Sequence, residues 1–197
     1  MAYYLRVLGT QPTSPTLERL SRDLQDATLT TQAGEPGAWS ELLLLAKDGH
    51  EIAVIERHEV KPGSLAAAEL DEFREALVDT QPASGAAWIT AFLGRVRVIH
   101  AIHVLGRSDA DWDAIGAVKN TLWNLAGDAI IQADGEGFTN TAGYQVVWQF
   151  SDKAKGTWWM GVLQDDRWVH FEMDLGDRGQ REAFLRGEVP AGVRLAD

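Results

Sequence analysis

The sequence predicts an α+β fold in which a largely antiparallel sheet is packed by about five helices. Segments of alternating apolar and polar residues, which are typical of strands, recur along the whole chain. Two pairs of such segments flank short polar turns, at Asp48-Gly49 and at Gln164-Asp165-Asp166, and this pattern predicts two hairpins. Between the strands lie stretches with the apolar spacing and the capping residues of helices.

The helices are recognised by their first and last residues. Ser108 and Asp111 make a capping box, and Gly127 ends the helix that follows them. Pro15 suits the first position of the first helix, because the N–H that proline lacks has no partner there. In chain order, the residues expected to begin the helices are Ser14, Ser64, Ser84, Ser108 and Asp177.

Strands are expected wherever the alternation is bounded by glycine or by polar residues. The expected ranges are 2–8, 27–32, 42–46, 51–57, 95–105, 129–133, 144–150, 157–163 and 167–175. The final ten residues are expected to form a surface tail.

Short similarities between the two halves suggest an internal duplication. Val7-Leu8-Gly9 and Val104-Leu105-Gly106 each end a strand that precedes a helix, and similar turns follow at 32–35 and 132–136. The duplicated parts would be residues 1–80 and 95–187, joined by a helix at 84–94. With or without a repeat, we expect a single compact α+β domain over residues 1–197.

The charge of the chain limits its partners. It has 18 Lys and Arg against 29 Asp and Glu, a formal net charge of −11, and both halves share the excess. Nucleic acids are bound by clusters of basic residues, and the nearest approach to one here is Arg95 with Arg97. We therefore expect neither nucleic acid nor an anionic membrane as partner. A basic protein fits this surface, and the alternative is that the charge serves only solubility.

The chain contains no cysteine, which excludes disulfides, thiolate catalysis and cysteine-ligated zinc. Residues 1–6 lack the basic and apolar regions of a signal peptide, and no apolar run reaches the roughly 18 residues that cross a bilayer. These observations predict a cytoplasmic protein.

Common catalytic motifs are absent from the sequence. It has no His-Glu-x-x-His zinc motif, no Gly-x-Ser-x-Gly elbow and no Walker A loop. His100 and His103 point to opposite faces of one strand, and His50 and His58 bracket another, so neither pair is placed to share a metal ion. We expect no cofactor, and the balance favours a protein that is not an enzyme.

One candidate site is the loop at residues 132–140. Asp134, Glu136 and Asn140 offer oxygen atoms on a backbone that glycines allow to turn tightly, as hard cations require. The alternative is an ordinary turn in which these side chains bond their own backbone.

A second candidate site is one face of the predicted sheet. Alternation along 167–175 and 144–150 predicts that this face carries Gln145, Gln149, Trp168, His170 and Glu172, joined by either Trp158 or Trp159. Such a surface could bind a small molecule or a partner, and His170 beside Glu172 could transfer protons near neutral pH. The alternative is a solvated face of an antiparallel sheet.

Two functional hypotheses follow. The first is a non-catalytic protein-binding or regulatory protein, comparable to immunity proteins, whose acidic surface and exposed tryptophans engage a partner. The second is a small-molecule binding protein or hydrolase that uses the face around His170 and Glu172. The sequence does not define the oligomeric state.

Overall fold

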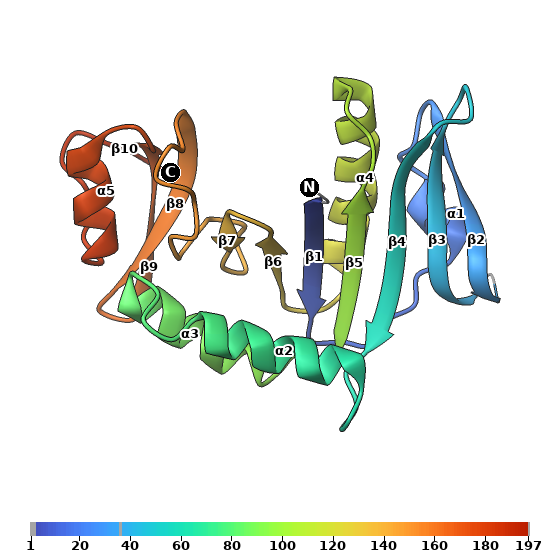
Figure 1. Cartoon of the computed structure of the whole chain (residues 1–197), viewed down its shortest axis with the longest axis horizontal. Coiled ribbons are helices and arrows are strands. Elements are labelled where there is room, and N and C mark those ends of the chain that lie inside the picture. The colour runs from blue at the N-terminus through green and yellow to red at the C-terminus, as the bar shows by residue number, and fades with distance from the viewer. Residues whose placement is uncertain (1–2, 36, 197) are drawn as a thin grey trace. The chain divides into compact units, whose positions relative to one another are not determined.

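The computed structural model describes residues 3–35 and 37–196, and the chain forms two compact units (Figure 1). The first unit lies within residues 1–68 and 96–129, and the second within 69–95 and 130–197. No helix of the described residues is long and apolar enough to cross a membrane.

Five antiparallel strands form the sheet of the first unit. In the order in which they lie side by side, they are β2 (Ala27–Glu35), β3 (Ala38–Ala46), β4 (Glu51–Glu59), β5 (Val98–Val104) and β1 (Tyr3–Gly9). The turn between β3 and β4 contains Asp48 and Gly49, so the first predicted hairpin is confirmed. Gly49 has a φ of 90°, the left-handed conformation that glycine adopts at no steric cost.

Two helices cover this sheet, α1 (Leu17–Ser21) and α4 (Asp109–Leu125). The apolar stripe of α4 places Ile115, Val118 and Leu122 in the core, against apolar side chains of the strands. The side chain of Ser108 accepts a hydrogen bond from the backbone N–H of Asp111, and the side chain of Asp111 accepts one from the backbone N–H of Ser108, so the capping box is confirmed.

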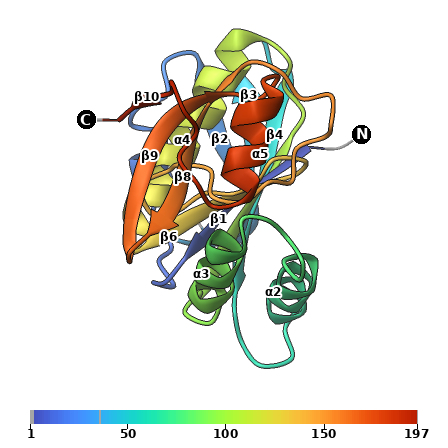
Figure 2. The same cartoon turned by 90° about the vertical axis from the view of Figure 1, so that its left-hand side faces the viewer.

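The second unit contains α3 (Ala83–Leu93) and, from Glu69 onward, most of α2 (Leu65–Ala76). Strands β6 (Ala129–Ala133) and β7 (Gly137–Phe138) pair as a short hairpin. A three-stranded antiparallel sheet follows, in the order β10 (Arg194–Leu195), β9 (Arg167–Asp174) and β8 (Thr157–Gln164). Helix α5 (Arg178–Leu185) packs against β9 (Figure 2) and contributes Phe184 to a core with Met160, Phe171 and Met173.

The predicted α+β class, with five helices and antiparallel strands in the described residues, is confirmed. The predicted hairpin around Asp165 and Asp166 is also present, between β8 and β9. The single domain over residues 1–197 and the duplication of 1–80 and 95–187 stay predictions.

Local details of three predictions are wrong. The first helix is capped by Thr16 and not by Ser14, because the carbonyl of Pro15 instead accepts the indole N–H of Trp39 at 2.7 Å. The third helix begins at Ala83, with Pro82 at its N-cap position in place of Ser84. Residues Arg194–Leu195 of the predicted tail form β10, which pairs with β9.

The predicted strand at 144–150 is also wrong. Its backbone N–H groups donate to acceptors in different segments. That of Val146 donates to the carbonyl of Phe138, and that of Trp148 donates to the carbonyl of Gln81. Only Gln145 makes isolated bridges, to Thr139 and Met160. The segment is therefore irregular, and its burial does not alternate, since Gln145, Val146 and Val147 are all buried.

Candidate functional sites

A pocket of about 630 Å³ opens in the first unit, a volume within the range of known ligand sites. Three segments form it: residues 23–27 before and at the start of β2, the turn between β3 and β4, and the first turns of α4. Leu24, Ile52 and Ala114 supply apolar surface. The pocket also contains five carboxylates, those of Asp23, Asp26, Asp48, Asp111 and Asp113. We call this the acidic pocket.

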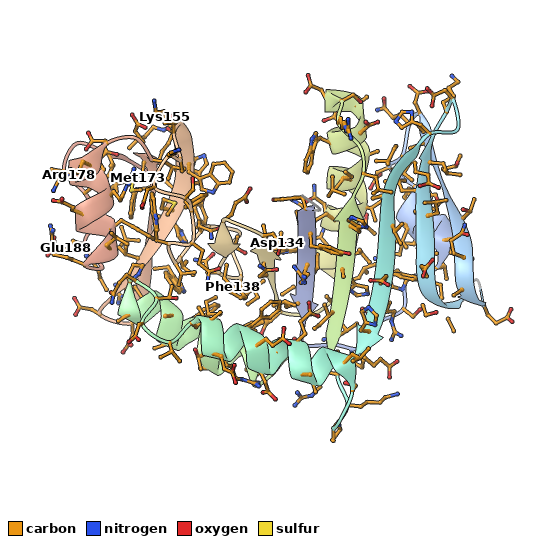
Figure 3. All side chains as sticks on the ribbon, in the orientation of Figure 1. Asp134, Phe138, Lys155, Met173, Arg178 and Glu188 are labelled. Atoms are coloured by element: carbon orange, nitrogen blue, oxygen red, sulfur yellow. The ribbon has the colours of Figure 1, made fainter. Side chains whose placement is uncertain are left out.

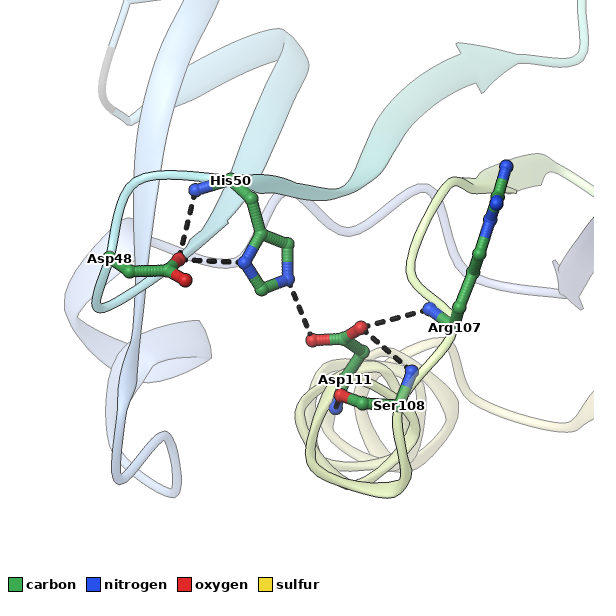
Figure 4. Close-up of polar contacts among 5 residues, drawn as sticks. All are labelled: Asp48, His50, Arg107, Ser108 and Asp111. Carbon is green, nitrogen blue, oxygen red and sulfur yellow. Dashed lines mark hydrogen bonds and ion pairs between the residues drawn. The ribbon is translucent and has the colours of Figure 1, made fainter.

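The imidazole of His50 lies between two of these carboxylates (Figure 4). Its Nδ1 is 2.6 Å from Oδ1 of Asp48, and its Nε2 is 3.0 Å from Oδ1 of Asp111. The backbone N of His50 also donates to Oδ1 of Asp48, at 3.1 Å. His50 thereby joins the turn between β3 and β4 to the N-terminus of α4.

These contacts determine the protonation state of His50. An ionised carboxylate only accepts hydrogen bonds, so both ring nitrogens must carry a proton to satisfy both contacts. Hydrogen bonds to Asp111 and then to Asp48 raise the pKa of His50 above its usual value. The imidazolium is therefore kept to higher pH than in a free histidine, and in that form His50 can act neither as a general base nor as a metal ligand.

Asp111 is held as an anion by the start of its own helix. Oδ2 accepts the backbone N–H groups of Ser108, at 3.0 Å, and of Arg107, at 2.9 Å (Figure 4). These two bonds hold the pKa of Asp111 well below its usual range, although burial acts in the opposite direction. Gly106 makes room for this arrangement, since a Cβ there would lie 2.6 Å from Cβ of Asp111.

Sequence reasoning missed this cluster. It treated His50 only as one of two histidines that bracket a strand, and Asp111 only as a capping residue. Asp48 and His50 are two residues apart, which is a local signal, but His50 and Asp111 are 61 residues apart. Folding alone brings that second pair together.

A hollow of about 450 Å³ lies in the second unit and gathers residues from both predicted sites. Asp134 and Glu136, predicted as metal ligands, share it with Gln149 and Trp158, which were predicted on the sheet face. Phe150 lies 5.5 Å from Trp158, centroid to centroid, with its ring nearly perpendicular to the indole. Lys155, labelled with Asp134 in Figure 3, is a further charged residue that lines this hollow. We call it the aromatic hollow.

Strand register separates the two adjacent tryptophans of β8. Trp158 lies opposite Met173 of β9, on the face that carries the core, whereas Trp159 lies opposite Glu172 on the other face. Each is 37% exposed. Trp159 is therefore the tryptophan that joins the predicted polar face, and Trp158 lines the aromatic hollow.

His170 is packed by neighbours within the second unit. Its ring stacks on Tyr144 with centroids 3.7 Å apart, and Nε2 lies 2.9 Å from Nδ2 of the fully buried Asn140. Oδ1 of Asn140 accepts backbone N–H groups from Ala142 and Tyr144, so Nδ2 must be the donor to His170. Nε2 thus carries no proton, and burial lowers the pKa of His170.

Strand register places Trp159, Trp168, His170 and Glu172 on one face of the β8–β9 sheet, whereas Gln145 is turned into the protein and Gln149 lines the aromatic hollow. Gln145 is buried, and its Nε2 donates to the carbonyl of Glu136 at 2.6 Å. Glu172 forms an ion pair of 2.6 Å with Arg194, whose guanidinium lies over the ring of Trp159. Trp168 packs edge-on against Trp88. His170 and Glu172 line neither the acidic pocket nor the aromatic hollow.

No three His, Asp or Glu side chains converge as metal ligands within residues 3–35 and 37–196. Asn140, the third predicted ligand, uses its side-chain oxygen for the two backbone bonds and its nitrogen for His170. The acidic pocket presents carboxylates beside apolar surface, and the aromatic hollow presents aromatic rings beside charged groups.

Comparison of the chain with models of protein families, with curated proteins and with solved structures finds no match.

Proposed function

We propose that this protein is a non-catalytic binding protein that takes basic side chains of a protein partner into the acidic pocket. The observation that carries the proposal is the lining of that pocket, where five carboxylates face one lysine and one histidine. The net charge of −11 favours the same kind of partner, because opposite charge speeds encounter and excludes acidic competitors.

The two kinds of surface in the acidic pocket match the two parts of a lysine or arginine side chain. Leu24, Ile52 and Ala114 can pack against the aliphatic stem, while carboxylates pair with the charged head. The walls are formed in advance, since the capping box holds the start of α4 and backbone hydrogen bonds hold the turn between β3 and β4. Binding would then cost little ordering of the protein.

A hexa-arginine peptide is a suitable probe, because its charge does not change with pH near neutrality. Titration calorimetry at low salt should show binding that weakens as salt increases. The double variant Asp23→Asn, Asp113→Asn should weaken binding roughly tenfold, as expected for the loss of two partly exposed ion pairs.

The matched control removes two charges elsewhere, as Glu35→Gln with Asp152→Asn, both exposed and outside the acidic pocket. It should weaken binding by less than about threefold. Equal losses in the two double variants, or no binding to the wild-type protein, would overturn the proposal.

A regulatory role of the immunity type and a cytoplasmic location belong to the same proposal. Their support is the acidic surface and the absence of cysteine.

A second candidate function is small-molecule binding at the aromatic hollow. The observation that favours it is the convergence of Trp158, Phe150 and Gln149 with charged residues around one concavity.

Binding at the aromatic hollow can be tested by following the indole N–H signals in NMR spectra while a panel of small aromatic and cationic compounds is added. A compound that binds in the aromatic hollow should shift the indole signal of Trp158. It should bind less tightly to Trp158→Ala and with unchanged affinity to Trp159→Ala, because Trp159 is equally exposed but lies on the opposite face. Equal effects of the two variants would contradict binding in the aromatic hollow.

Proton transfer by His170 and Glu172 stays a prediction.

A further inference from the structure

We infer that the acidic pocket is a proton-linked site, in which a basic ligand and the proton on His50 compete. This inference rests on the proposed function and describes how that same site is regulated. It follows from the place of His50 in the wall of the pocket, between Asp48 and Asp111.

The first step is what His50 loses when it gives up its proton. A neutral imidazole has one N–H, so it can donate to only one of the two carboxylates. The contact with Asp48 is shorter, 2.6 Å against 3.0 Å, and lies within one turn, so Nδ1 keeps the proton. The lone pair of Nε2 then faces Oδ1 of Asp111, and the pocket has lost one positive charge.

The second step is that the walls stay in place without this proton. The carbonyl of His50 accepts the backbone N–H of Ala46 at 2.9 Å, and the N–H of Gly49 donates to the carbonyl of Ala46 at 2.9 Å. Asp111 keeps its bonds to the backbone of Arg107 and Ser108. Because backbone bonds hold both sides, the change in charge decides the effect on binding.

The third step is the charge that a ligand would meet. His50 is the one histidine in the described lining of the pocket, and histidine is the side chain that normally titrates between about pH 5 and 8. The charged groups around it come from every segment of the wall: Asp23 and Asp26 before β2, Lys47 and Asp48 in the turn, and Asp111 and Asp113 in α4. Removing the His50 proton leaves this set more negative by one charge, which favours a cation.

Linkage makes the competition reciprocal. If deprotonation of His50 strengthens binding of a basic ligand, then that ligand must lower the pKa of His50 by the equivalent free energy. The two effects can be measured separately, one by affinity and one by NMR titration of the imidazole.

The experiment measures the affinity of hexa-arginine between about pH 5.5 and pH 9, at constant ionic strength. The wild-type affinity should rise roughly fivefold with pH, the scale expected for one charge a few ångströms away in a solvated pocket. His50→Gln, which cannot titrate, should bind with the affinity that the wild type reaches at high pH and show no such rise. His58→Gln is the matched control, since His58 pairs with Glu56 on β4 outside the pocket, and it should follow the wild type.

Imidazole NMR of the wild-type protein checks the same linkage without a substitution. Saturating peptide should lower the pKa of His50. Peptide binding that is independent of pH while His50 titrates would overturn the inference and leave the proposed function standing. A rise with pH that persists in His50→Gln would also overturn it, whereas absence of binding at every pH would overturn the proposed function itself.

Discussion

Nε2 of His50 lies 3.0 Å from Oδ1 of Asp111, a contact that joins a hairpin turn to a helix 61 residues further along the chain. With the contact of Nδ1 to Asp48, it requires a doubly protonated ring between two anions. The stability of the first unit should therefore depend on pH in a defined direction.

The raised pKa of His50 predicts a stabilising contribution at low pH that disappears as pH rises. The contribution is complete below the unfolded pKa of histidine, about 6.5, and is lost as pH passes through the higher folded value. The lowered pKa values of Asp48 and Asp111 act in the opposite sense. Their contribution is present above about pH 4 and is lost on further acidification. The cluster should therefore stabilise most between about pH 4 and 6.5.

Urea unfolding of the wild-type protein and of His50→Gln checks this. The difference in unfolding free energy should be largest near pH 5.5 and should shrink toward pH 9. His58→Gln serves as the control, because the carboxylate contact of His58, to Glu56, is longer, at 3.6 Å. If the difference in unfolding free energy between the wild type and His50→Gln did not change with pH, a charged His50 between Asp48 and Asp111 would be contradicted.

Ser108→Ala should lower the free energy of unfolding by about 1 kcal/mol, because the backbone N–H of Asp111 loses its capping partner. Asn120→Ala, an exposed change in the middle of the same helix, should be neutral or slightly stabilising, since alanine is the better helix former. Denaturant unfolding followed by circular dichroism measures both. A loss in Asn120→Ala equal to that in Ser108→Ala would argue against the capping role.

Two glycines in helices should respond oppositely to alanine. A Cβ at Gly85 of α3 would lie 2.1 Å from the carbonyl oxygen of Val146, whereas one at Gly116 of α4 would meet nothing within 4 Å. Gly116→Ala should stabilise by roughly 0.5–1 kcal/mol through helix propensity. Gly85→Ala should destabilise by about 1–3 kcal/mol, because backbone must move to relieve the overlap. Unfolding free energies test the pair, and a stabilising Gly85→Ala would show that this close approach does not exist.

Asn140→Asp should change the protonation of His170. The amide nitrogen that now donates to Nε2 would become an oxygen that only accepts, so Nε2 would have to carry a proton. The new negative charge should also raise the pKa of His170, opposing the effect of burial. Nitrogen-15 NMR of the imidazole measures both the protonation of Nε2 and the pKa of His170. Asn120→Asp, a surface control with the same change in charge, should leave the spectrum of His170 as in the wild type.

The hairpin turn and the helix cap could be predicted from the sequence because the hydrogen bonds that form them join residues close together in the chain. The hairpin turn at Asp48-Gly49 and the capping box of Ser108 with Asp111 both depend on hydrogen bonds between residues a few positions apart. The alternation along 167–175 corresponds to a strand, β9, in which Phe171 and Met173 are buried. Alternation failed for 144–150, because a strand also needs a neighbour, and the N–H groups of Val146 and Trp148 find acceptors in two different segments.

The sequence by itself determined the α+β class, the capped helix over the acidic pocket and the acidic, cysteine-free composition. Only the tertiary structure decided which candidate residues meet. It placed Trp158 rather than Trp159 beside Asp134 and Glu136, and it brought Asp111 to His50. The reason is that capping and alternation act between near neighbours in the chain, whereas a site depends on strand register and on the packing of segments far apart in sequence.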